Sequence, residues 1–265
     1  MLDRITIRDA AGLNYPRDIF AALGNSSSNP LLVIAPHDDD AQLAASVAIF
    51  ESIRAGGEAH IVVVTDGRMG FQDSESKKGI VEARKKECVA SCAALGVPQE
   101  NLHRLEFPDA SLNRHAGAWQ DSDGSVRGLT AELTRVIRMI NPGAVMMPIE
   151  SDIHPDHRLV SIEGQIACFH SASRIWSELG QPSSFRPALW GYACYAPFPG
   201  GPDLELVADD DAWERKKAAV LAYKSQPEII PSLVSDLENM GKREYFKKIN
   251  RPQLHYREYY ELFNK

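Results

Sequence analysis

Two short strings carry histidines and carboxylates in the combination that binds a catalytic metal ion. They lie more than a hundred residues apart and read Pro36-His37-Asp38-Asp39-Asp40 and His154-Pro155-Asp156-His157. A hydrolytic zinc site uses three ligands of these types and leaves a fourth position open. The chemistry that the strings indicate is therefore metal-assisted hydrolysis.

Both strings follow apolar runs that are typical of buried parallel strands. The runs are 31–35 (LLVIA) and 144–149 (AVMMPI). In open α/β sheets, sites form outside the carboxyl ends of the strands. The two strings are thus expected to meet at one edge of a sheet.

The rest of the chain predicts alternating strands and helices. Further strands are expected at 59–65, 102–107 and 189–195, and helices at 41–55, 76–95, 130–140 and 212–223. This alternation predicts an α/β fold with a mostly parallel, doubly wound sheet flanked by helices. Residues 1–30 are expected to form a polar lead-in. The single domain covers 1–265, with a core at about 31–226 and an irregular C-terminal cap or lid at about 227–265.

Composition narrows the class of partner. The 265 residues are 44% hydrophobic and carry a net charge of -7, which argues against duplex nucleic acid or an anionic membrane as partner. No apolar run reaches the ~20 residues that span a bilayer, and the start lacks the pattern of a signal peptide. The four cysteines contain no CxxC pair and indicate reduced thiols in the cytoplasm. No GxGxxG, P-loop or GxSxG motif is present, so neither a nucleotide site nor a serine hydrolase is indicated.

The residues of the two strings suggest a division of roles. His37 and Asp40, three residues apart at a turn between strand and helix, can converge on one ion with His157. Asp39, beside a ligand, is the natural general base; otherwise it would cap the helix.

His154 lies near the ion by chain geometry and, if protonated, would donate to the oxyanion. Asp156 would orient that imidazole and favour its charged form. Asp38 is expected to be solvated or to cap a helix.

The same residues resemble a known family. His37 to Ala41 is similar to the HPDDE signature of the PIG-L/LmbE-like N-acetylglucosaminyl deacetylases, and HPDH at 154–157 matches that family's second signature. The similarity extends through 64–67 (VTDG), 107–109 (FPD) and 223–226 (YKSQ), and covers about residues 31–226. Each piece alone is weak, whereas their order and spacing together are specific.

The resemblance implies a Rossmann-like fold, one zinc ion per chain and a set of roles. The implied zinc ligands are His37, Asp40 and His157, with Asp39 as base and His154 as the electrophilic histidine backed by Asp156. It further implies that Asp109 and Arg84 contact the sugar substrate. Several members of the family assemble as oligomers, so a homo-oligomer is compatible with the resemblance.

Two positions depart from the family pattern. Asp38 stands where the family usually has proline, and Ala41 stands where it usually has glutamate. Changes beside metal ligands commonly alter metal affinity by ~10–100-fold. We therefore expect an active site whose metal affinity differs from that of its relatives.

These observations predict a zinc-dependent hydrolase that removes acetyl from the 2-acetamido group of an N-acetylglucosamine-containing small molecule or glycoconjugate. Amide cleavage of a thiol-sugar, an antibiotic or a lipid-linked sugar is the alternative within the same chemistry. A magnesium-dependent phosphoryl hydrolase built on residues 38–40 is a second alternative, although two histidines favour zinc. A sugar-binding module with a vestigial site is a third.

Overall fold

A nine-stranded sheet forms the centre of the molecule. The computed structural model describes residues 5–12, 14–15, 18–71, 77–239 and 241–250, and among these the strand order is β2-β1-β10-β11-β9-β8-β3-β4-β5. Five strands are parallel: β3 (Leu31–Ala35), β4 (Ala59–Thr65), β5 (Leu102–Phe107), β8 (Ala144–Pro148) and β9 (Ala188–Tyr192). Four antiparallel strands extend this sheet beyond β9: β1 (Thr6–Asp9), β2 (Asn14–Tyr15), β10 (Leu204–Val207) and β11 (Arg243–Lys248).

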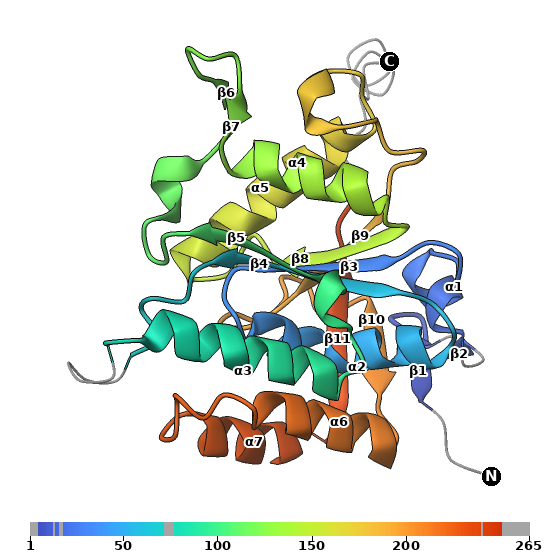
Figure 1. Ribbon diagram of the computed structural model, residues 1–265. Helices are drawn as coiled ribbons and strands as arrows, with labels where there is room; N and C mark the ends of the chain where they lie inside the picture. The colour runs from blue at the N-terminus through green and yellow to red at the C-terminus, as the bar shows by residue number, and fades with distance from the viewer. Residues whose placement is uncertain (1–4, 13, 16–17, 72–76, 240, 251–265) are drawn as a thin grey trace.

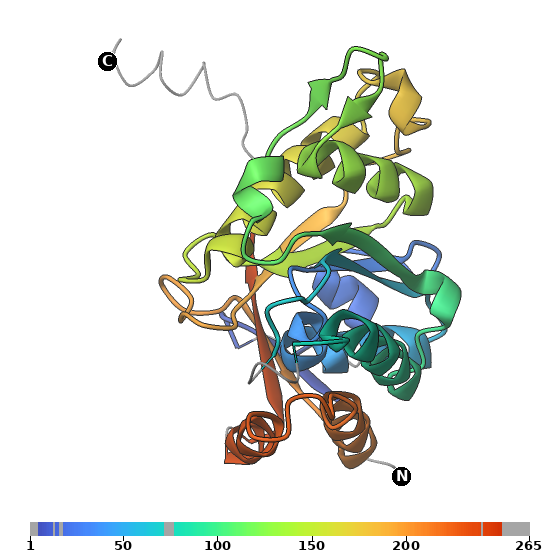
Figure 2. The same ribbon diagram turned by 60° about the vertical axis from the view of Figure 1, so that its left-hand side comes forward.

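Helices cover both faces of the parallel strands (Figures 1 and 2). The helices are α1 (Ile19–Leu23), α2 (Asp40–Arg54), α3 (Ile80–Ala94), α4 (Leu129–Ile140), α5 (Pro155–Ser171), α6 (Asp210–Val220) and α7 (Ile230–Asn239). Successive residues of a strand point to opposite faces. Val33 therefore packs in the core under α2 and α3, whereas Ile34 packs in the core under α4 and α5. The predicted α/β fold is confirmed.

The connection between β5 and α4 leaves the sheet at the edge that carries the site. It contains a 3-10 turn at Leu112–His115 and the small hairpin β6 (Trp119–Gln120) with β7 (Val126–Arg127). Two further 3-10 turns lie at Gln99–Asn101 and Ser177–Leu179.

The two ends of the chain are more regular than the sequence predicts. The polar lead-in contains β1, β2 and α1, and the segment expected to be an irregular cap contains α7 and β11 up to Lys248. The strand β11 lies between β10 and β9, and its Phe246 is fully buried. The prediction of an irregular cap is therefore wrong for α7 and β11, because the buried Glu244 and Phe246 of β11 place this strand inside the sheet. Residues 251–265, with the remaining C-terminal aromatics, lie outside the described residues.

Strand β11 also contacts the helix that begins at the site. Glu244 accepts hydrogen bonds from the backbone N–H groups of Val47 and Ala48 in the middle of α2. Lys216 of α6 donates to Glu244 at 2.8 Å and to the carbonyl of Leu43 at 2.7 Å. Both charged side chains are almost fully buried, and buried charges persist only when they are paired. This ion pair connects α6 and β11 to α2.

Strand order brings the two strings together. β8 and β3 are neighbours, and α5 and α2 begin just beyond their carboxyl ends. The turns after β4 and β5 lie at the same edge on the other side of β3. Four strand ends therefore converge on the first turn of α2.

Candidate metal centre and active site

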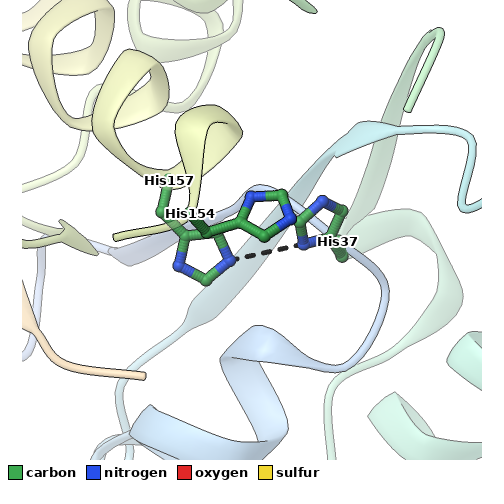
Figure 3. Close-up of side chains that lie close together, drawn as sticks. All are labelled: His37, His154 and His157. Carbon is green, nitrogen blue, oxygen red and sulfur yellow. Dashed lines mark hydrogen bonds between the residues drawn. The ribbon is translucent and has the colours of Figure 1, made fainter. Parts of the chain in front are cut away.

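Three side-chain atoms form a nearly equilateral triangle at this edge. His37 Nδ1 lies 3.2 Å from Asp40 Oδ2, His157 Nε2 lies 3.3 Å from the same oxygen, and the two nitrogens are 3.3 Å apart. Figure 3 shows the imidazoles of His37 and His157 joined across this distance, with His154 beside them. A tetrahedral ion with bonds of about 2.0–2.1 Å places its ligand atoms about 3.3 Å apart. The three residues therefore fit a tetrahedrally coordinated divalent ion.

Local structure fixes each corner of the triangle. Asp40 is the first residue of α2, and its Oδ2 accepts a hydrogen bond of 2.8 Å from the backbone N–H of His37. His157 lies in the first turn of α5, which begins with His154 as N-cap and Pro155 at its first position. The three side chains are almost entirely buried.

The second nitrogen of each ligand imidazole faces carboxylates. His37 Nε2 lies 3.3 Å from Asp109 Oδ1 and 3.5 Å from Asp156 Oδ2, while His157 Nδ1 lies 3.3 Å from Asp152 Oδ2. Metal-binding histidines almost always donate their other ring N–H to such a group, which fixes the ring and raises its basicity. The surroundings of both rings thus match those of metal ligands.

These carboxylates make the cluster favourable for positive charge. Burial alone would lower the pKa of His37, but hydrogen bonds to Asp109, Asp156 and Asp40 raise that pKa well above its usual value. Burial would also lower the pKa of His157, and the carboxylate of Asp40 raises it. Burial would raise the pKa of Asp40, whereas its contacts with His157 and His37 lower it well below the usual range. A cation is therefore stabilised where these groups meet.

Asp39 occupies the N-cap position of α2 without capping it. Its side chain makes no capping hydrogen bond, and its Oδ1 pairs with Arg84 Nη2 at 3.2 Å. Burial raises the pKa of Tyr195 and of Cys194, and the negative charges of Asp40 and Asp39 raise both further, so both carboxylates act on the same part of the site. Asp39 is therefore paired with Arg84 instead of the helix N-terminus, and its role as base stays a prediction.

His154 lies beside the two ligand imidazoles, with ring centroids 4.8 Å and 5.0 Å away. Its Nδ1 accepts a hydrogen bond from the backbone N–H of Asp156, so Nε2 carries the proton of the neutral ring. Burial and the neighbouring histidines lower the pKa of His154.

The carboxylate of Asp156 takes a different partner from the predicted one. It lies beside His37 and accepts a hydrogen bond from the backbone N–H of Ala110, whereas its backbone N–H is what binds His154. The helix N-cap at His154 produces this difference, because it directs the Asp156 backbone, not its carboxylate, at the ring.

The two residues expected at the sugar are both buried. Asp109 holds His37 and accepts a hydrogen bond of 3.2 Å from the backbone N–H of Met69. Arg84 is 2% exposed and pairs with Asp38 and Asp39. Asp38 is itself fully buried, so the expectation of a solvated or capping Asp38 is wrong, because two arginines neutralise it.

The site also contains three residues that the sequence analysis does not identify. Asp152 contacts His157, Cys194 Sγ lies 3.7 Å from Asp40 Oδ1, and the Tyr195 ring stacks on His154 with centroids 5.7 Å apart. Asp152 stands only two residues before His154, so its closeness to the second string is a feature of the sequence that could have identified it. Cys194 and Tyr195 lie at the end of the strand predicted at 189–195, where they show no motif, and in the structure they follow β9, which ends at Tyr192.

A separate cavity of about 440 Å³ lies at the opposite end of α5. Its lining consists of Arg138, Arg174, Ile175, Ser177 and residues 180–182. The guanidinium of Arg138 donates to six backbone carbonyls of residues 170–180. That arginine organises the loop, and the cavity is separate from the metal centre.

A family comparison agrees with the fold and the site. The model of the PIG-L family, described as GlcNAc-PI de-N-acetylase, matches residues 32–166, a segment that contains both strings. The chain belongs to the PIG-L family.

Two curated relatives are deacetylases of amino sugars. The diacetylchitobiose deacetylase of Thermococcus kodakarensis is 32% identical over 132 residues, which is 48% of this chain and 45% of that protein. The match therefore spans less than half the length of that relative. The 1D-myo-inositol 2-acetamido-2-deoxy-alpha-D-glucopyranoside deacetylase of Nakamurella multipartita is 25% identical over 266 residues, covering 82% of this chain and 88% of that protein.

Solved structures share the fold across almost the whole domain. The N,N'-diacetylchitobiose deacetylase of Pyrococcus horikoshii superposes with a TM-score of 0.67 at 22% identity and covers 87% of this chain and 90% of its own. The 4-carboxy-2-hydroxymuconate hydratase GalB of Pseudomonas putida superposes with a TM-score of 0.65 at 19% identity, covering 85% and 98%. The fold thus supports more than one reaction, and function has to be argued from the site.

The helices were also compared with what a membrane span requires. Among the described residues, none of them combines the length and the apolar character that crossing a bilayer requires.

Proposed function

We propose that this chain is a zinc-dependent N-deacetylase that hydrolyses the 2-acetamido group of an N-acetylglucosamine-containing molecule. The observation that carries the proposal is the triangle of His37 Nδ1, Asp40 Oδ2 and His157 Nε2, with sides of 3.2–3.3 Å. The named curated relatives remove acetyl groups from amino sugars, which supports this substrate class.

Zinc is the proposed ion because of the donor set. Two imidazole nitrogens and one carboxylate oxygen suit zinc, whereas magnesium prefers oxygen ligands alone. Bound in the triangle, zinc would polarise the acetamide carbonyl and lower the pKa of a water molecule towards neutrality.

The chain's own residues then carry the proton transfers. Asp39 would accept a proton from the attacking water, and its carboxylate later returns that proton to the departing amine. His154 would donate a hydrogen bond from Nε2 to the oxyanion, since its Nδ1 is occupied by the backbone N–H of Asp156. Asp109 and Asp156 would hold the ring of His37, and Asp152 would hold that of His157.

The test is acetate release from a panel of acetamido sugars. The panel contains N-acetylglucosamine, diacetylchitobiose and the inositol-linked sugar, each offered to zinc-loaded and chelator-stripped protein side by side. We expect acetate from at least one member, only with the zinc-loaded protein, and release that is about 10²–10⁴-fold slower with the Asp39→Asn variant. Zinc-loaded protein that releases no acetate from any member would contradict the proposal.

Other amide conjugates are the next candidates in that case. Thiol-linked, antibiotic-linked and lipid-linked sugars use the same chemistry. The segment between β5 and α4 begins beside the site, where Asp109 contacts His37 and the Ala110 N–H donates to Asp156, and it is the proposed selector among them. The magnesium alternative loses support because Asp38 is fully buried between two arginines. A cytoplasmic location, one zinc ion per chain, a single functional domain and a homo-oligomer remain predictions.

A further inference from the structure

Asp38, which departs from the family pattern, is the centre of a buried ion cluster behind the site. Arg84 Nε of α3 lies 3.1 Å from Asp38 Oδ2, and Arg104 of β5 pairs with Asp38 Oδ1. Asp38 is fully buried and Arg84 is 2% exposed. A buried carboxylate held by two guanidinium groups is strongly fixed, because removing any partner leaves a buried charge unpaired.

The same guanidinium reaches the neighbouring carboxylate. Arg84 Nη2 lies 3.2 Å from Asp39 Oδ1, so Arg84 bridges two consecutive aspartates, one fully buried and one with a side chain 17% exposed. A guanidinium is planar and rigid. Fixing Nε on Asp38 therefore also fixes where Nη2 meets Asp39.

The surroundings of Arg84 leave it little freedom to turn towards a substrate. Its Cζ lies 5.5 Å from the centre of the Tyr223 ring, and Tyr223 donates its hydroxyl hydrogen bond to the backbone carbonyl of Asp38. A Cβ at Gly67 would lie 2.2 Å from Asp38 Oδ2 and 3.0 Å from Arg84 Nε, so the loop after β4 packs directly on the pair. The third nitrogen, Nη1, is buried and has no hydrogen-bond partner among the described residues.

We propose that Asp38 and Arg84 form a positioning unit that holds the carboxylate of Asp39 at the metal centre. Asp38 fixes Arg84, and Arg84 fixes Asp39, which directly precedes the ligand Asp40. Arg84 is then a positioning residue that acts through the base, in place of the substrate contact that the family resemblance implies. The proposal rests on the proposed function, because it assigns Asp39 its role as base.

Arg84→Lys and Arg84→Met test the unit by a split between kcat and KM. A misplaced catalytic group commonly costs about 100-fold in rate, so we expect kcat to fall about 10–100-fold, with KM and zinc content unchanged. Asp38→Asn should act in the same direction. The control is Arg54→Met, which removes an arginine that pairs with Glu51 and Asp209 at the far end of α2 and should leave both constants unchanged.

A double variant separates positioning from general damage. Residues that act as a unit show strongly non-additive effects. Adding Arg84→Met to Asp39→Asn should therefore lower residual turnover no further. A further loss of the same size, a raised KM with unchanged kcat, or unchanged constants in folded Arg84→Lys would each overturn the proposal. If Arg84→Met does not fold, Arg84→Lys with Asp39→Asn carries the same comparison.

A crystal structure of Asp38→Asn supplies a readout that does not depend on turnover. We expect the Asp39 carboxylate to leave its present position while His37, Asp40 and His157 stay in place. An unmoved Asp39 would contradict the positioning unit. Wild-type protein that releases no acetate would instead contradict the proposed function, and the crystal structure would still decide the positioning.

Discussion

Two pairs of histidines lie in contact at opposite edges of the parallel part of the sheet, one pair beyond the carboxyl ends of β3 and β8 and the other near the amino ends of β4 and β5. His37 and His157 meet at the carboxyl end with nitrogens 3.3 Å apart, and His60 and His103 meet near the amino ends of β4 and β5 with nitrogens 3.1 Å apart. Distance alone does not distinguish these pairs.

The charged groups around the two histidine pairs distinguish them. Four aspartate carboxylates contact the first pair, and the pKa of both rings is raised against the effect of burial. Glu58, 3.1 Å from His60 Nε2, faces the second pair, and burial lowers the pKa of both His60 and His103. Converging carboxylates, more than close imidazoles, therefore distinguish the candidate metal site from the second pair.

The largest expected effect is the loss of zinc when one imidazole of the first pair is removed, and the matched removal from the second pair is the control. His157→Ala deletes a corner of the ligand triangle, so zinc should be lost on dialysis and turnover should fall to background. His103→Ala should retain stoichiometric zinc, as measured by metal analysis of the purified protein. Equal zinc loss in both variants would show that the carboxylates do not distinguish the pairs.

Asp39→Asn, a change beside the first histidine pair, should lower turnover without removing the metal ion. General acid–base catalysis contributes about 10²–10⁴-fold, and we expect kcat to fall by a factor in this range. Zinc content should stay at the wild-type level. Among the described residues, the Asp39 side chain pairs with Arg84 and has no hydrogen bond or ion pair with His37, Asp40 or His157. Loss of the metal in this variant would reassign Asp39 as a ligand.

Asp152→Asn tests the carboxylate behind His157. It removes the charge that faces His157 Nδ1 while keeping the shape of the side chain. Such changes typically weaken metal binding about 10–100-fold, which competition with a chelator of known affinity would measure. Glu58→Gln, the matched change at His60, should leave zinc affinity unchanged. An unaffected affinity in Asp152→Asn would mean that this carboxylate does not support the ligand.

Much of this arrangement follows from the sequence alone. The apolar runs at 31–35 and 59–65 were expected as strands and have those bounds, because buried parallel strands are continuously apolar. Their order places His37 and His157 at one edge. Asp38 could not be placed, since its two arginine partners come from α3 and β5, and sequence spacing does not encode contacts between distant elements. Strand β11 escaped prediction for a related reason: its burial depends on strands β10 and β9.

The smallest expected effect concerns the second pair and the stability of the fold. Because burial lowers the folded-state pKa of His60 and His103 below 6.5, the unfolded chain binds more protons as the pH falls through that value. Their contribution to stability is therefore fully present above about pH 6.5 and is lost as the pH falls towards the folded pKa. A His60→Gln/His103→Gln variant of the zinc-loaded protein should lose stability less steeply between pH 6.5 and pH 5, by less than about 1 kcal/mol. Urea unfolding at several pH values would measure this. A slope identical to that of the wild type would mean that the two rings bind protons equally in the folded and the unfolded chain, and the contrast with the carboxylate-rich pair would then lose its electrostatic basis.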